Sequence, residues 1–170
     1  MPVAWTIYRA LCCVTPGLEP ERAAFEAANA RFAERVTMPE AMLFALASPR
    51  SDFDPQINRR GLESNIRSCN FFVQVLGETA PDPALLEFVD LAVACTADPA
   101  FPLRSTAVMF RNPEGAASEI AAFRDKLTAN PHCAVHDFHD SSEFDALAEI
   151  ILADWRAKIQ QPVAASSAAP

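Results

Sequence analysis

The chain has 170 residues and a formal net charge of −8, with 51% hydrophobic and 21% charged residues. This length suits one globular domain, because single domains cluster at about 100–150 residues, and the composition is that of a folded chain. The acidic balance argues against nucleic acid and anionic membrane surfaces as partners. Its four glycines stand too far apart for a phosphate loop or a dinucleotide fingerprint, which excludes the two commonest glycine-rich nucleotide sites.

The sequence predicts a cytoplasmic protein without metal or cofactor. No apolar run reaches the roughly 20 residues of a membrane span, and the first residues lack the basic region of a signal peptide. The five cysteines lie in apolar segments without a Cys-x-x-Cys pair, which is typical of reduced thiols and not of a zinc site. Of the three histidines, His136 and His139 are an odd number apart on a predicted strand, so they would point to opposite faces.

Five short apolar runs alternate with five helical patterns along the chain. The predicted strands cover residues 6–14, 41–47, 71–77, 105–110 and 133–138. The helical patterns begin near Pro20, Asn58, Asp82, Pro113 and Ser142. Asp82 and Pro83 form an N-cap and a first helical residue, and the segment from Ser142 resembles a capping box.

Strands that alternate with helices and show no hairpin turns predict an all-parallel sheet. The nearly unbroken apolar run at residues 71–77 indicates a strand buried on both faces. With right-handed crossovers, the simplest fold is a three-layer, doubly wound α/β sheet of five strands in the order 2-1-3-4-5, a flavodoxin-like fold. We expect one domain over residues 1–159 and a mobile tail over residues 160–170.

In such sheets a ligand binds at the carboxyl ends of the strands, near the point where the strand order reverses. Thr15 and Gly77 follow the two strands at this point. The loop after the second strand and the start of the next helix are rich in polar groups that could receive an anionic ligand. Arginine, which is frequent there, is the usual partner of phosphate. These candidate ligand-binding residues are Arg50, Asp52, Asn58, Arg59 and Arg60. The alternative is a solvated loop whose charges pair with one another.

Two carboxylates on the third predicted helix, Glu87 and Asp90, are candidate catalytic groups. They are three residues apart, so they lie on adjacent turns of one face, within two turns of the predicted amino end of that helix. A carboxylate there could stabilise a cationic ribosyl centre or attack it, as in glycosidases. The alternative is an ordinary polar helix face.

Three segments resemble bacterial domains related to the Toll/interleukin-1 receptor (TIR) fold. The first is CVTPGLEPER, in which Thr15, Leu18, Glu21 and Arg22 match the family pattern and Gly17 replaces its usual Asp. The second covers residues 65–77 and is similar to the family's central strand. The third covers residues 86–92 and resembles its "E-x-x-x-A" helix.

This resemblance spans roughly residues 6–155 and implies a flavodoxin-like sheet. Catalytic relatives cleave NAD at the N-glycosidic bond or exchange nucleoside bases, using a Glu on or before the third helix. By this match Glu87 is the catalytic carboxylate, with Asp90 as the alternative because the spacing to Ala92 is one residue longer than usual. We therefore expect a domain that binds or cleaves a small nucleotide such as NAD. The alternatives are a noncatalytic signalling module that self-associates into a homo-oligomer and a nucleoside deoxyribosyltransferase-like enzyme.

Overall fold

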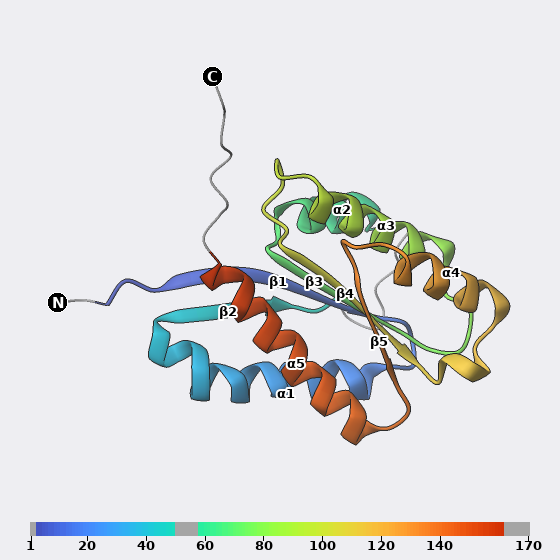
Figure 1. Ribbon diagram of the computed structural model, residues 1–170, viewed down its shortest axis with the longest axis horizontal. Helices are drawn as coiled ribbons and strands as arrows, with labels where there is room; N and C mark the ends of the chain where they lie inside the picture. Colours follow the sequence, from blue (N-terminus) through green and yellow to red (C-terminus); the bar gives the residue numbers. More distant parts are fainter. Residues whose placement is uncertain (1–2, 50–57, 162–170) are drawn as a thin grey trace.

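Five parallel strands form the middle layer of the protein. The computed structural model describes residues 3–49 and 58–161, and Figure 1 shows its sheet flanked by helices. The strand order is β2-β1-β3-β4-β5, and every neighbouring pair is parallel. The strands are β1 (Thr6–Val14), β2 (Met42–Ala47), β3 (Phe71–Leu76), β4 (Ser105–Arg111) and β5 (Ala134–Phe138). The predicted fold class and strand order are confirmed.

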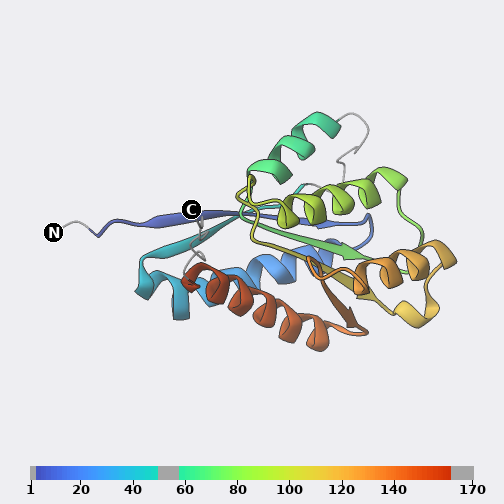
Figure 2. The ribbon, with the colours of Figure 1, turned by 45° about the horizontal axis from the view of Figure 1, so that its top comes forward.

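Five α-helices cover the two faces of this sheet. They are α1 (Glu19–Phe32), α2 (Arg59–Ser68), α3 (Pro83–Ala97), α4 (Ser118–Thr128) and α5 (Ser141–Gln160). Helices α1 and α5 lie on one face, whereas α2, α3 and α4 lie on the other (Figure 2). None of the helices within the described ranges is long and apolar enough to cross a membrane.

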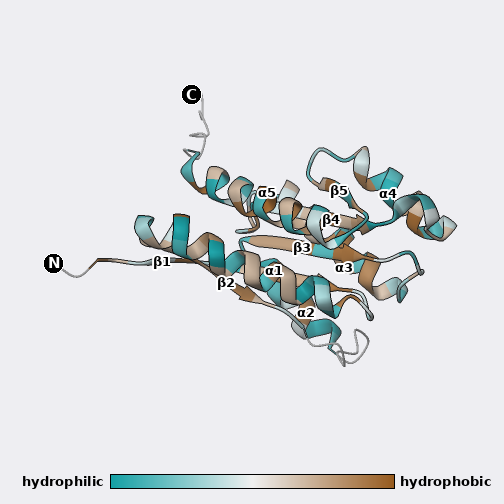
Figure 3. Ribbon diagram, turned by 90° about the horizontal axis from the view of Figure 1, so that it is seen from below, coloured by the Kyte–Doolittle hydropathy of each residue, from teal (hydrophilic) through white to brown (hydrophobic). Residues whose placement is uncertain are grey.

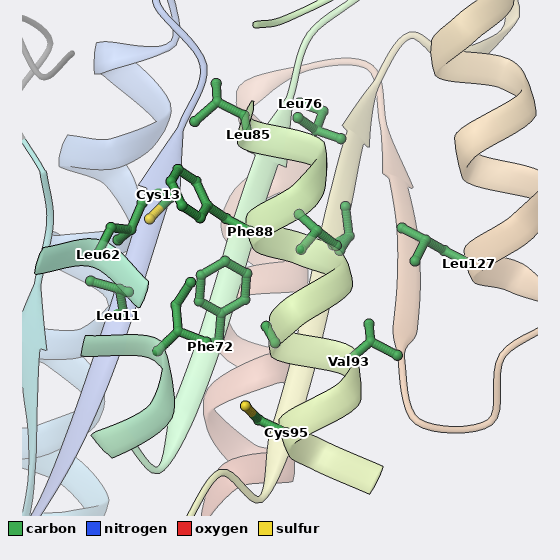
Figure 4. Close-up of a cluster of buried hydrophobic side chains, with 14 of the residues drawn as sticks. Leu11, Cys13, Leu62, Phe72, Leu76, Leu85, Phe88, Val93, Cys95 and Leu127 are labelled. Atoms are coloured by element: carbon green, nitrogen blue, oxygen red, sulfur yellow. The ribbon is translucent and has the colours of Figure 1, made fainter. Parts of the chain in front are cut away.

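The sheet separates two apolar cores. β3 is buried along its whole length, and its side chains alternate between the cores as a central parallel strand requires. Phe72 and Leu76 belong to the core under α2 and α3, which Figure 4 shows in close-up. Phe71 and Val73 belong to the core under α1 and α5. Figure 3 shows the hydrophobic strands between helices that also carry hydrophilic residues.

The N-cap of α3 is the residue that the sequence predicts, whereas the N-cap of α5 is a different one. Asp82 caps α3 as predicted, since its Oδ1 accepts a hydrogen bond of 2.9 Å from the Ala84 N–H. α5 is capped by Asp140, which accepts a bond of 2.9 Å from the Glu143 N–H, so its cap lies two residues before Ser142. Asp140 captures this N–H because its backbone is extended there. The helix includes Gln160, so the tail expected from residue 160 starts inside α5, and residues 162–170 lie outside the described ranges.

Candidate functional site

A cavity of about 470 Å³ lies where α2 passes over the carboxyl end of β2. Its floor includes Leu11 of β1 and Ala47 of β2, which are neighbours in the parallel ladder. Its wall is one face of α2. The lining residues are Leu11, Ala47, Ser48, Pro49, Asn58, Gly61, Leu62 and Asn65. The cavity thus lies at the carboxyl end of the edge strand β2, beside the ends of β1 and β3 where the strand order reverses and where open α/β folds commonly bind ligands, but it does not include them.

The wall that α2 supplies is made of two asparagine side chains, one glycine and one leucine. Asn58, Gly61, Leu62 and Asn65 follow one another at three- and four-residue intervals, so they share one helix face. Leu62 is buried, whereas Asn58, Gly61 and Asn65 are exposed to the opening. Amides can both donate and accept hydrogen bonds. This wall can therefore recognise a polar, uncharged part of a ligand beside an apolar surface.

Gly61 leaves part of this wall without a side chain. An ideal Cβ built at Gly61 meets no atom within 4 Å, so packing does not demand a glycine there. A glycine inside a helix costs about 0.5–1 kcal/mol relative to alanine. The sequence therefore bears this cost at a position where a larger residue would extend into free space beside the cavity.

Arg59 is occupied by carboxylates. Its guanidinium bonds to Glu63 at 2.9 Å and also pairs with Glu87 of α3. It further lies 5.9 Å from the centre of the Phe88 ring. The hydrogen bonds that Arg59 donates to Glu87 and Glu63 raise the pKa of Arg59 above its usual value. The group joins α2 to α3 and is largely neutralised as a partner for phosphate.

The two candidate catalytic carboxylates point to different neighbours. Glu87 is exposed and pairs with Arg59 of α2. Asp90, also exposed, accepts hydrogen bonds of 2.7 and 2.8 Å from Lys126 of α4. Neither residue is among those that line the 470 Å³ cavity. The structure thus places both carboxylates in ion pairs between helices.

Thr15 and Gly77 come together at the ends of β1 and β3. The Thr15 N–H donates to the Val75 carbonyl at 3.1 Å. A Cβ at Gly77 would lie 3.8 Å from the Thr15 Oγ1 and 3.8 Å from a methyl of Leu18. Leu18 therefore packs against this pair, and neither residue lines the cavity under α2.

The other predicted ligand-binding residues divide between the described and undescribed parts of the chain. Arg50 and Asp52 fall within residues 50–57, which lie outside the described ranges. Arg60 is exposed at the start of α2, and Asn58 lines the cavity. Sequence reasoning missed Leu11, Gly61 and Asn65. The signal that could have found the two helical residues is their spacing from Asn58 on the inner face of α2.

The histidines form no metal centre in the part of the chain that the structure describes. No group of three or more described His, Cys, Asp or Glu side chains could hold a metal ion there. His136 lies on β5 and His139 follows that strand. The His139 ring contacts Glu143 at 2.9 Å and Glu114 at 3.0 Å. These carboxylates raise the pKa of His139, with the hydrogen bond to Glu143 as the larger cause.

Comparison with known proteins adds no family to these observations: no protein-family model matches the chain, and no curated protein matches it.

Proposed function

We propose that the protein is a TIR-like recognition domain that binds a small nucleotide in the cavity under α2. The observation that carries this proposal is the amide-lined cavity at the carboxyl end of β2, with Leu11 of β1 in its floor. Its volume falls in the range of about 300–1,000 Å³ that is usual for small-molecule pockets. Asn58 and Asn65 would bond to polar edges of a base or ribose, and Leu11 and Leu62 would contact its apolar surface.

The negatively charged phosphate of such a ligand would be bound by an arginine outside the cavity. Arg60 is exposed one residue from Arg59, and no ion pair with a described residue engages it, so its guanidinium would be available to meet a phosphate. The five free cysteines support a reducing, cytoplasmic setting for such a domain.

Recognition is favoured over cleavage by the position of Glu87. A carboxylate that attacks or stabilises a ribosyl centre must reach the bound sugar. Glu87 instead pairs with Arg59 and does not line the cavity. Cleavage of the N-glycosidic bond is therefore an outcome that the test must distinguish from binding alone.

The test is a calorimetric titration with NAD, ADP-ribose, AMP and adenosine. A Gly61→Leu variant would fill the cavity from a helical position that has free space. Gly115→Leu is the matched control, because its Cβ also meets no atom within 4 Å and it lies after β4, away from α2. We expect at least one of these compounds to bind, Gly61→Leu to weaken binding more than tenfold, and Gly115→Leu to leave it unchanged.

The proposal is refuted if none of the four compounds binds, or if Gly61→Leu binds them with the same affinity as the wild type. Release of nicotinamide from NAD is measured in parallel for the wild type and Glu87→Gln. Release that disappears in Glu87→Gln would establish cleavage, and equal background release in both proteins would leave recognition as the function.

A further inference from the structure

The amino-terminal part of β1 has an unpaired edge. β1 pairs with β2 from Thr6 onward but with β3 only from Ala10 onward. The start of β1 consequently extends past the start of β3 with only β2 beside it, and Figures 1 and 2 show the amino-terminal end of the chain reaching out from the sheet there. Residues 3–7 are all exposed.

The hydrogen bonds on either side of β1 identify which backbone groups are free. The Thr6 N–H donates to the Ala41 carbonyl at 2.9 Å, so Thr6 faces β2. The Arg9 carbonyl accepts from the Asn70 N–H at 2.8 Å, and the Arg9 N–H donates to the Asn70 side chain at 2.9 Å. Successive residues of a strand direct their backbone groups to opposite sides. Ile7 therefore faces the same side as Arg9, where no described strand is paired with it.

The same alternate residues carry exposed apolar side chains. Val3, Trp5 and Ile7 are 67%, 47% and 60% exposed. They are three of the five exposed large hydrophobic residues in the described ranges. Val3 and Trp5 precede β1, and a continuation of the strand by these residues would place both on the face of Ile7. An unpaired strand edge with apolar side chains is a template for pairing with another strand.

We propose that this edge pairs with the same edge of a second copy, as an antiparallel two-stranded contact about a two-fold axis. With the axis at Trp5, Val3 of each copy lies opposite Ile7 of the other, and the two Trp5 residues lie opposite each other. Once pairing extends β1 to residues 3–5, all three residues would direct their backbone groups outward as Ile7 does, so each opposed pair would exchange two hydrogen bonds.

The register follows from the groups that are already occupied. An axis at Ile7 would place Trp5 opposite Arg9, whose N–H and carbonyl are bonded to Asn70. An axis at Thr6 would bring Val3 of the partner copy to the position of Asn70. With the axis at Trp5, the pairing of residues 3–7 stops short of Arg9. It also brings the aromatic and β-branched side chains into cross-strand pairs, which stabilise sheets.

A second copy suits this edge in shape, charge and area. The edge is self-complementary, because the same residues supply donors and acceptors to each other. The chain carries a net charge of −8, but residues 3–8 contain no charged residue, so like charges do not meet at the contact. The three side chains hold roughly 300 Å² of exposed apolar area per copy. A dimer formed through this area would bury less than about 1,200 Å² in total, which is typical of weak interfaces, so we expect dimerisation to depend on concentration.

Sedimentation velocity over a hundredfold range of concentration tests the contact. Ile7→Pro removes the outward N–H without removing a bond to β2, because proline is tolerated where a strand N–H faces away from the sheet. Ile7→Lys places a charge on the edge, which discourages strand pairing. Ile150→Lys is the matched control, since Ile150 is a similarly exposed isoleucine on α5.

We expect the wild type and Ile150→Lys to shift from monomer toward dimer as concentration rises. Ile7→Pro and Ile7→Lys should stay monomeric, with melting temperatures within a few degrees of the wild type. In Trp155→Phe, Trp5 is the remaining tryptophan, and its fluorescence emission should shift to shorter wavelength as the protein concentration rises. The double variant Trp155→Phe/Ile7→Pro should show no such shift. A monomeric wild type, or dimerisation unaffected by both Ile7 variants, would overturn the proposal. Neither outcome bears on nucleotide binding under α2.

Discussion

Replacing Gln74 by methionine should stabilise the protein. Gln74 is fully buried in β3. The alternation of side chains along a strand places it on the side of Phe72 and Leu76. Its Nε2 donates to the Val75 carbonyl at 3.2 Å. Its Oε1 has no hydrogen-bond partner among the described residues. A buried acceptor without a partner loses its hydration on folding and regains nothing.

The expected gain follows from two opposing terms. Loss of the Nε2 bond costs about 1 kcal/mol, whereas removal of an unpaired buried polar atom recovers about 1–3 kcal/mol. No new unpaired group is created, because the Val75 carbonyl keeps its bond of 3.1 Å from the Thr15 N–H. Methionine nearly matches glutamine in length and adapts to irregular space. The net expectation is a gain of about 1 kcal/mol, which raises the melting temperature by roughly 2–4 °C in a domain of this size.

Urea unfolding followed by circular dichroism measures this difference. The midpoint should rise without a change in slope, because the area exposed on unfolding stays the same. Gln160→Met, at an exposed position of α5, is the control and should change stability little. A loss of 1 kcal/mol or more in Gln74→Met would refute the reasoning, because it would mean that Oε1 has a partner such as a buried water.

Two further results follow from the packing and the electrostatics. Trp155 stacks on Phe71 with ring centres 4.8 Å apart. Trp155→Ala should therefore lower the free energy of unfolding by about 3–5 kcal/mol in the same urea assay. A loss under 1 kcal/mol would contradict this packing. The raised pKa of His139 means that its ion pairs with Glu143 and Glu114 stabilise the fold below about pH 6.5 and lose this effect as the pH rises through the raised pKa. Nuclear magnetic resonance titration of the His139 ring should show the raised pKa, and Glu143→Gln should lower it; an unshifted pKa in the wild type would contradict the contact.

Much of the fold could be predicted because its signals are local. The strand over residues 6–14 was predicted with the bounds that β1 has, and the bounds of β3 differ from the prediction only at Gly77. A run that is apolar at every position, as in β3, requires cover on both faces. Helices between successive strands then leave an all-parallel sheet with few topologies.

The candidate site was less accessible to sequence reasoning because its contacts are long-range. Glu87 meets Arg59 across 28 residues, and Asp90 meets Lys126 across 36 residues. Spacing along α3 placed both carboxylates on one face, but the rotation of α3 between α2 and α4 decides which cation each one reaches. The cavity likewise depends on how far α2 stands from the edge of the sheet, and this distance is set by the packing of Leu62 and Ile66.

The sequence by itself determined the elements, their order and the parallel sheet, since these depend on residue patterns within each segment. It also determined that any nucleotide site must work without a glycine-rich phosphate loop. Only the tertiary structure decided that Arg59 is held by carboxylates, that a cavity opens beside Gly61, and that β1 extends past β3 with a free edge. Those features arise where separate elements meet, and the relative placement of packed elements is fixed by their combined shape and not by any one segment.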